Sequence, residues 1–255
     1  TTYAQLAVDV FGVPIEKIRI VQGDTDRAVG FGSAGSRSLF TGGSAVKVAS
    51  QKTVEQAQDL AAEELEAAPS DIEYRDGAFR IAGTDRSIGL FELAAKQPER
   101  RLFIDSTTAV QAPSWPNGCH ICEVEVDPDT GEVEVVGYAS VNDVGRVVNP
   151  MIVKGQLDGG AVQGLGQALS ASFLDYAMPR ADMVKSFKTE LDQSTPCLTN
   201  PLGVKGVGEL GTIGATPAAV NAVVDALWRA GAGDRALGVQ MPLVPERVWR
   251  ALNGR

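Results

Sequence analysis

The spacing of hydrophobic and polar residues divides the chain into helical and extended segments. Residues 2–11 place apolar side chains on one face at helical spacing, and Gly12 is suited to end that helix. Residues 43–67 are rich in Ala, Gln and Glu, which predicts a long helix that Pro69 closes. Residues 18–21 instead predict a short strand, because they are branched and apolar at alternate positions.

Two further segments have the pattern of β-hairpins. Residues 72–81 contain Asp76-Gly77, a dipeptide that supplies the positive φ angles of a tight turn. Residues 119–136 alternate between apolar and polar on both sides of a turn, and the pattern continues into a strand at 138–142. Each hairpin is therefore expected to bury one face.

Three more helices are expected. Residues 87–96 resemble a short capped helix, and Thr216 and Pro217 are suited to the N-cap and first position of a helix that Gly231 ends. Residues 153–169 are helical but contain many glycines, each of which costs about 0.5–1 kcal/mol relative to Ala. These glycines predict the close approach of either another backbone or a ligand.

Helices and hairpins together predict an α+β fold with mixed, largely antiparallel sheets and packed helices. Residues 106–117 contain two prolines and two threonines and form the best candidate for a linker. The chain is therefore expected to have two lobes, residues 1–112 and residues 113–255.

Composition narrows the class of protein. The 255 residues are 44% hydrophobic and carry a net charge of -9 without any basic run, which argues against nucleic-acid binding. The three cysteines are scattered, which favours a reducing, cytoplasmic compartment over a disulfide framework. We expect no membrane span and no signal peptide, and the first residues already resemble the middle of a helix, as if the chain were cut there.

Two loops have the spacing G-x-G-x-x-G, residues 30–35 and residues 206–211. A dinucleotide fold needs this loop directly between a strand and a helix, and neither loop meets that requirement. In the first loop, Ser33, Ser36 and Arg37 add hydroxyl and guanidinium donors that suit a pyrophosphate or another anion. A flexible surface loop with a solvated arginine explains the same residues equally well.

Glu209 stands among the glycines of the second loop, just before a helix. A carboxylate on such a turn can be presented to a cleft, where burial would raise its pKa toward the range of a general base. Spacing alone favours the simpler interpretation of a surface glutamate.

Cys119-His-Ile-Cys122 has the spacing of a metal-ligand pair, but the sequence offers no second pair at suitable distance. His120 is the only histidine, so Ser/His/Asp catalysis is also disfavoured. We interpret the segment as structural and expect no side chain of this chain to ligate a metal.

Several spaced motifs together resemble the molybdenum hydroxylases, the family of xanthine dehydrogenase, aldehyde oxidoreductase and the aerobic carbon monoxide dehydrogenase large subunit. These motifs occur in order at residues 23–38, 155–166, 175–181, 205–223 and 241–249. The resemblance covers essentially the whole chain, which makes it more specific than any single motif. Relatives usually have a short acidic hairpin near residue 170 that is missing here.

The resemblance implies a molybdenum–molybdopterin cofactor, in bacterial members usually the cytosine dinucleotide form. It implies that Glu209 is the general base, which takes a proton while a water-derived oxygen attacks an electrophilic substrate carbon. The residues that the resemblance places at the cofactor are Ser33, Ala34, Gly35, Ser36, Arg37, Gln156 and Gly208.

The resemblance also implies partners. Iron–sulfur clusters and FAD belong to partner subunits or domains, and an N-terminal half of the molybdenum subunit supplies other cofactor contacts. The chain alone is expected to be inactive, and its small-molecule substrate could be an aldehyde, an N-heterocycle or carbon monoxide. The alternative is a non-catalytic assembly module or remnant that keeps the fold and binds no cofactor.

Overall fold

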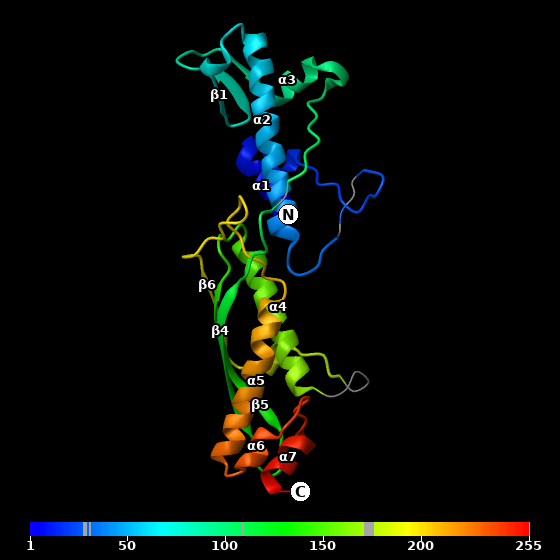
Figure 1. Cartoon of the computed structure of the whole chain (residues 1–255), viewed down its shortest axis with the longest axis vertical. Coiled ribbons are helices and arrows are strands. Elements are labelled where there is room, and N and C mark those ends of the chain that lie inside the picture. Colours follow the sequence, from blue (N-terminus) through cyan, green and yellow to red (C-terminus); the bar gives the residue numbers. More distant parts are fainter. Residues whose placement is uncertain (28–29, 31, 109, 171–175, 255) are drawn as a thin grey trace. The chain divides into compact units, whose positions relative to one another are not determined.

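The computed structural model describes residues 1–27, 30, 32–108, 110–170 and 176–254, which form two compact units (Figure 1). Unit 1 contains Thr1–Pro113 and Leu198–Gly203, and unit 2 contains Ser114–Cys197 and Val204–Arg255. Residues 198–203 belong to unit 1 although the residues on both sides of them belong to unit 2. The two lobes expected from the sequence were each one continuous segment. The expected α+β class is confirmed: each unit combines helices with one three-stranded sheet.

Unit 1 is built on a long helix. Its elements are α1 (Thr2–Phe11), η1 (Ile15–Lys17), the π-helical turn η2 (Leu39–Gly43), α2 (Ser44–Leu65), η3 (Pro69–Asp71), β1 (Ile72–Arg75), β2 (Ala78–Ile81), β3 (Ser87–Gly89), α3 (Leu90–Lys96) and η4 (Pro98–Arg100). Gly12, at φ 61°, ends α1 as expected, and Asp76 and Gly77 form the hairpin turn with φ angles of 49° and 77°. Phe79 and Leu93 are fully buried against α2, so the hairpin and α3 share one small core.

The strand expected at residues 18–21 is wrong. These residues pair with no strand in the described part of the chain, and Ile20 and Val21 remain 39% and 50% exposed. A strand needs a hydrogen-bonding neighbour, which local alternation cannot supply. Residues 87–96 are corrected too: they begin as β3, which pairs with β2, and become helical only at Leu90.

Unit 2 contains the second expected hairpin, β4 (Asn117–Val126) and β5 (Val133–Asp143), with an irregularity between Glu123 and Val124. A third strand, β6 (Phe187–Asp192), runs parallel to β5. The sequence did not predict this parallel pair, because parallel partners lie far apart in the chain and need a crossover, here one that includes a helix.

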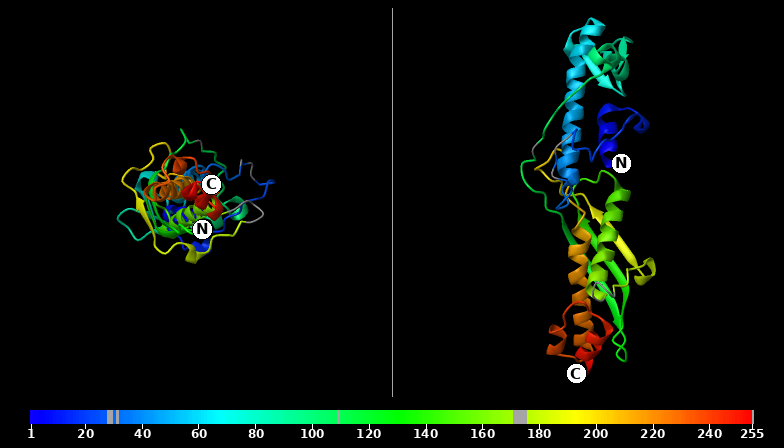
Figure 2. Two further views of the ribbon diagram at one scale, coloured as in Figure 1. Left: turned by 90° about the horizontal axis from the view of Figure 1, so that it is seen from below. Right: turned by 90° about the vertical axis from the view of Figure 1, so that its right-hand side faces the viewer.

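The helices of unit 2 are α4 (Pro150–Leu169), η5 (Ala181–Met183), α5 (Leu210–Arg229), α6 (Asp234–Leu237) and α7 (Pro245–Asn253). Asn149 caps α4 by accepting the Ile152 N–H at 3.0 Å. Figures 1 and 2 show α4 and α5 side by side along the sheet. Tyr138 of β5 is buried between the sheet and both helices, in one cluster with Leu165 and Ala219.

Glycines allow α4 and α5 to pack backbone against backbone. A Cβ on Gly160 would lie 3.2 Å from the Gly211 Cα, and one on Gly164 would lie 2.8 Å from the Thr212 carbonyl oxygen. The Thr212 hydroxyl donates to the Gly160 carbonyl at 2.8 Å. The close approach expected of the glycine-rich helix is therefore, at these positions, an approach to the backbone of α5.

The start of α5 corrects the sequence prediction. The helix begins at Leu210, so Thr216 and Pro217 lie inside it rather than at its N-terminus. The Thr216 hydroxyl donates to the Thr212 and Gly164 carbonyls at 3.1 and 3.2 Å. Packing against α4 evidently outweighs the proline, which costs about 3 kcal/mol inside a helix.

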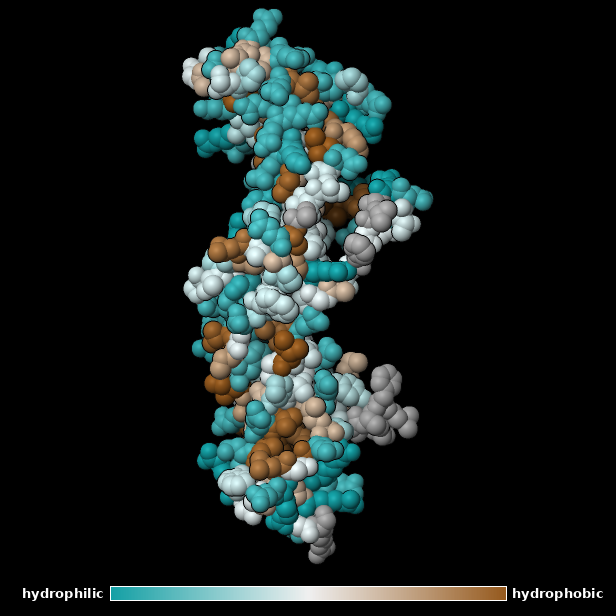
Figure 3. All heavy atoms as spheres, viewed as in Figure 1, coloured by the Kyte–Doolittle hydropathy of each residue, from teal (hydrophilic) through white to brown (hydrophobic). Residues whose placement is uncertain are grey.

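Helix α5 is also the one described helix long and apolar enough to cross a membrane by length and composition, and 33% of the tested window is buried. The core helix of a protein passes the same test, so the criterion does not contradict the expectation that the chain has no membrane span. The buried residues of α5, among them Ala215, Ala219 and Val223, pack into the core of unit 2, as those of a core helix do. On the face shown in Figure 3, hydrophobic surface forms separate patches among hydrophilic atoms.

The α4–α5 contact is expected to be sensitive to a single methyl group. Gly211→Ala would press a Cβ against the Leu157 carbonyl oxygen, and should destabilise unit 2 by about 1–3 kcal/mol. Gly159→Ala meets nothing within 4 Å and should be neutral or stabilising by up to about 1 kcal/mol. Urea unfolding followed by the fluorescence of the three tryptophans, all in unit 2, measures both effects. Equal stabilities for the two variants would contradict the close contact.

Candidate functional site

The residues singled out in the sequence fall into two groups, one in each unit. Ser33, Ala34, Gly35, Ser36 and Arg37 lie together in unit 1. Gln156 on α4, with Gly208 and Glu209 before α5, lies in unit 2. Each group therefore lies within one unit, and in unit 2 the neighbouring residues Leu157, Val207 and Leu210 pack in one cluster.

The unit 1 group forms a tight turn that leads into η2 and α2. Gly32, Gly35 and Ser36 have positive φ angles of 70°, 56° and 55°. The hydroxyl oxygens of Ser33 and Ser38 lie 2.5 Å apart, and the Arg37 N–H donates to the Ala34 carbonyl at 3.3 Å. Exposed hydroxyls are thereby gathered at the start of a continuous helical stretch, where backbone N–H groups favour an anion.

Two side-chain hydrogen bonds, one of them from α1, fix the end of this turn. The Tyr3 hydroxyl donates to the Ser38 carbonyl at 2.8 Å, and the Thr41 hydroxyl donates to the Arg37 carbonyl at 2.8 Å. A Cβ on Gly42 would lie 2.5 Å from the Tyr3 hydroxyl oxygen, so the glycine makes room for that tyrosine. The loop is therefore fixed at its helical end and exposed at Ser33, Ala34 and Gly35.

Glu209 occupies the N-cap position of α5, with φ −100° and ψ −15°. Its neighbours Val207 and Leu210 pack with Leu157 of α4, while Glu209 itself is exposed. The burial expected for a base is therefore not provided by the described part of this chain. The backbone around the carboxylate is nevertheless anchored on both sides.

Gln156 is exposed on α4 between two glycines that behave differently from Gly160. A Cβ on Gly155 or Gly159 would meet nothing within 4 Å, and both residues are exposed. Contact with α5 explains Gly160 but leaves Gly155 and Gly159 unexplained. Near Gln156, α4 therefore presents bare backbone to the space outside the chain.

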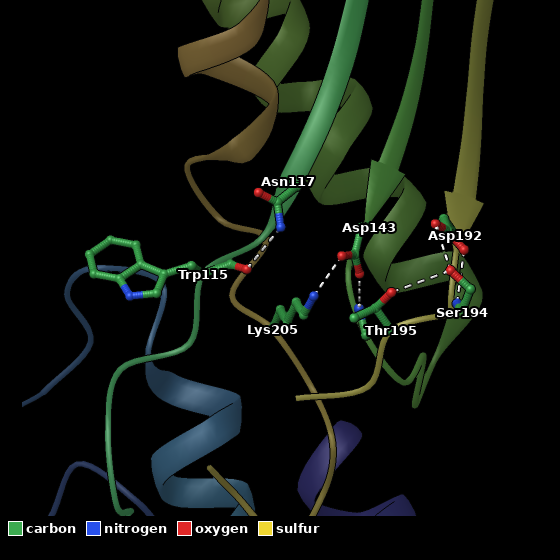
Figure 4. A network of polar contacts seen from close by, with 8 residues as sticks. Trp115, Asn117, Asp143, Asp192, Ser194, Thr195 and Lys205 are labelled. Carbon is green, nitrogen blue, oxygen red and sulfur yellow. Dashed lines mark hydrogen bonds and ion pairs between the residues drawn. The ribbon is translucent and has the colours of Figure 1, made fainter. Parts of the chain in front are cut away.

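A largely buried ion pair, which no sequence pattern predicts, holds the segment that leads to Glu209. The Lys205 ammonium lies 2.5 Å from the Asp143 carboxylate, and the two side chains are 8% and 15% exposed (Figure 4). Burial raises the pKa of Asp143, but hydrogen bonds from Lys205 and the Gly145 N–H, together with the Lys205 charge, outweigh it and hold the pKa below its usual value. No local spacing indicates this pair, because the two residues meet only in the folded unit.

His120 belongs to a polar network on the inner face of the sheet. Its Nδ1 lies 2.5 Å from the Tyr138 hydroxyl and its Nε2 lies 3.1 Å from Asn142 Oδ1. Burial lowers the pKa of His120, which favours the neutral ring, although the Asn142 hydrogen bond opposes the shift. The ring packs against Gly214 of α5 and so occupies the place where a side chain would stand.

The two cysteines beside His120 lie on opposite faces of β4, because successive strand residues alternate. Burial raises the pKa of Cys122 to about 11, which keeps this thiol protonated. Within the described ranges, no three His, Cys, Asp or Glu residues are grouped so that they could hold a metal ion.

The chain matches a family model and is similar to several known proteins. The family model "Molybdopterin cofactor-binding domain" matches residues 1–184. The nicotine 6-hydroxylase large subunit of Paenarthrobacter nicotinovorans is 36% identical over all of this chain and 34% of its own length. The 6-hydroxypseudooxynicotine dehydrogenase complex subunit gamma of the same organism is 34% identical over the same shares of both chains.

The fold has a close counterpart among solved structures. The Cu,Mo-CO dehydrogenase in its carbon monoxide reduced state superposes with a TM-score of 0.87 at 32% identity, covering 100% of this chain and 34% of that chain. The chain therefore spans about a third of the length of the relatives that it matches.

Acid should weaken unit 2 through Asp143. A carboxylate whose pKa is lowered on folding contributes stability above its unfolded pKa, about 3.9, and loses it as the pH falls through the folded value. Asp143→Asn leaves Lys205 buried without a partner charge, so it should cost about 3 kcal/mol at pH 7 and flatten the loss of stability below about pH 5. Urea midpoints measured from pH 7 to pH 3 test this. Glu134→Gln, in the exposed pair with Lys185, is the control, and curves of identical shape for wild type and Asp143→Asn would refute the assignment.

Proposed function

Because this chain belongs to the molybdopterin cofactor-binding domain family, we propose that it forms the molybdopterin-binding portion of a molybdenum-dependent hydroxylase, with Glu209 as the catalytic base. The observation that carries the proposal is the pairing of α4 and α5. Contact between these helices fixes the N-terminus of α5, where Glu209 stands. The same α4 presents uncovered backbone beside Gln156.

The residues present fit such a cofactor. A large, rigid, polar ring system can lie against a helix only where side chains are absent, and Gly155 and Gly159 provide such a surface. Gln156, between them, offers an amide that can donate and accept hydrogen bonds. We assign Gln156 and Gly208 to the cofactor-binding surface of unit 2.

The turn in unit 1 suits the phosphate part of the cofactor. Ser33 and Ser36 supply hydroxyls, Arg37 supplies a guanidinium, and the turn precedes a helical stretch that favours negative charge. We propose that Ala34 and Gly35 let this backbone approach a pyrophosphate, which would be that of the cytosine dinucleotide form.

When bound, molybdenum–molybdopterin would supply the two-electron redox chemistry of the reaction. In the proposed mechanism, Glu209 accepts the proton of the water-derived oxygen that attacks the electrophilic carbon of the substrate. Gln156 orients the bound group, and the α4–α5 contact holds the carboxylate at one place relative to that group.

We propose that the chain works together with further protein segments or subunits. The matched relatives are named as subunits or chains of larger enzymes, and about two thirds of their length is not represented here. We propose that an N-terminal half of the molybdenum subunit completes the pocket and buries Glu209. Iron–sulfur and flavin subunits would then carry the electrons away, in a cytoplasmic complex.

An N-heterocycle is the first substrate class to test, because two of the most similar relatives are named for nicotine-type compounds. Carbon monoxide and aldehydes remain in the panel, since other relatives are named for them. The non-catalytic alternative is not favoured, because the family model is that of a cofactor-binding domain and the similar relatives are named as enzymes.

Replacing the proposed base should separate chemistry from cofactor binding. Glu209→Gln, tested in the complete protein with its copurifying subunits, should keep molybdenum at the wild-type level and lower kcat about 100- to 10,000-fold. The amide keeps the shape of the side chain but cannot accept the proton. Metal analysis and turnover on the substrate panel are the measurements. Near-normal turnover would exclude Glu209 as the base, and absence of molybdenum from the wild-type complex would exclude the proposed function.

Filling the bare face of α4 should displace the cofactor without unfolding the protein. Gly159→Leu adds a side chain where nothing within 4 Å opposes it, so we expect a normal unfolding midpoint and a loss of bound molybdopterin of about tenfold. Gln167→Leu, at an exposed position two turns further along α4, is the matched control and should keep its cofactor. Full cofactor content in Gly159→Leu would show that this face does not contact the group.

A further inference from the structure

The buried pair of Lys205 and Asp143 is costly to build. Two charges removed from water lose their hydration, and apolar side chains of the same size often stabilise a protein as well or better. The pair is 8% and 15% exposed, with its atoms 2.5 Å apart. A contribution to overall stability therefore explains the ion pair poorly. A role in fixing the local path of the backbone explains it well.

The pair ties the segment before Glu209 to the end of β5. The Lys205 N–H donates to the Val144 carbonyl at 2.9 Å, and Val204 forms an isolated antiparallel bridge with Gly145. Asp143 also accepts the Gly145 N–H at 3.1 Å, so one carboxylate holds both the turn after β5 and the lysine. Figure 4 shows the side chain of Lys205 extending from the loop before α5 to Asp143 at the end of β5.

Between this anchor and α5 lie Gly206, Val207 and Gly208. Glycine loses the most conformational freedom on folding, so such a segment keeps one path only when both ends are fixed. At the far end, Gly211 is fixed against α4, and Val207 and Leu210 pack with Val144. Asp143 and Lys205 fix the near end, and Glu209 lies between the two anchors.

Resting on the proposed role of Glu209, we propose that Lys205 and Asp143 are positioning residues that aim the Glu209 carboxylate through the Gly206–Gly208 segment. Neither residue is required to touch substrate or cofactor. The lysine charge is buried and neutralised, and its effect is mechanical. A displacement of about 1 Å at a reacting group is enough to slow turnover about 100-fold.

The decisive variant replaces the charges while keeping the shapes. Lys205→Met with Asp143→Asn removes both charges together, retains an acceptor for the Gly145 N–H, and avoids leaving one charge buried alone. The control is Lys185→Met with Glu134→Gln, the same change at an exposed pair of unit 2. Lys205→Arg, which keeps the charge, is the conservative variant.

In the complete protein, the variant with both Lys205→Met and Asp143→Asn (the buried double variant) should keep its molybdenum and its unfolding midpoint. It should lower kcat at least tenfold at unchanged KM, and it should speed hydrogen–deuterium exchange of the amides at 206–210, but not in the rest of α5. Lys205→Arg should recover part of kcat, and the control pair should match wild type in every measurement.

Three outcomes overturn the inference: wild-type kcat in the buried double variant, unchanged exchange at 206–210, or an equal loss in the control pair. Glu209→Gln, measured alongside, keeps the two proposals apart. If Glu209→Gln is inactive while the buried double variant is fully active, only the positioning role fails. If Glu209→Gln retains turnover, the proposed role of Glu209 as the base fails, and the positioning role fails with it.

Discussion

The close approach of α4 and α5 is the constraint on which the rest of unit 2 depends. Gly160 and Gly211 let the two backbones touch, and the Thr212 hydroxyl bridges them. Because glycines on each helix bring the two backbones into contact, the helices have little freedom to slide without losing that contact. The position of the α5 N-terminus, and with it that of Glu209, is thereby set by backbone rather than by flexible side chains.

The sheet adds the second anchor. Tyr138 of β5 is buried against both helices, and His120 of β4 packs against Gly214 of α5. At the end of β5, Asp143 holds Lys205 and so fixes the loop that leads into α5. Sheet, loop and helix pair thus form one rigid support beneath a carboxylate that is itself exposed.

In unit 1, glycines and a hydrogen bond from a neighbouring helix fix the loop that carries the candidate anion-binding residues. Gly32, Gly35 and Ser36 adopt positive φ angles that fold the loop tightly, and Tyr3 fastens its helical end. In both units, polar groups suited to a ligand stand at the start of a helix, where the backbone favours negative charge. The glycines determine the local shape of the surface, because some allow a neighbouring backbone to approach and others leave the backbone uncovered.

Elements whose signals lie within a few residues could be predicted from the sequence. The Asp76-Gly77 hairpin, the Gly12 end of α1 and the β4–β5 pair all follow from patterns within a few residues. The ordered motifs also determined the family. The role of Glu209 as a base rests on that resemblance, because spacing alone favours a surface glutamate.

Features that depend on partners far away in the chain are set by folding and could not be predicted from local patterns. Residues 18–21 alternate like a strand but have no partner among the described residues, whereas β6 became a strand because β5 was available. Pro217 lies within α5 because packing on α4 outweighs its local preference. Lys205 and Asp143 meet only after folding, because a buried ion pair is defined by geometry that neither residue carries in its own neighbourhood.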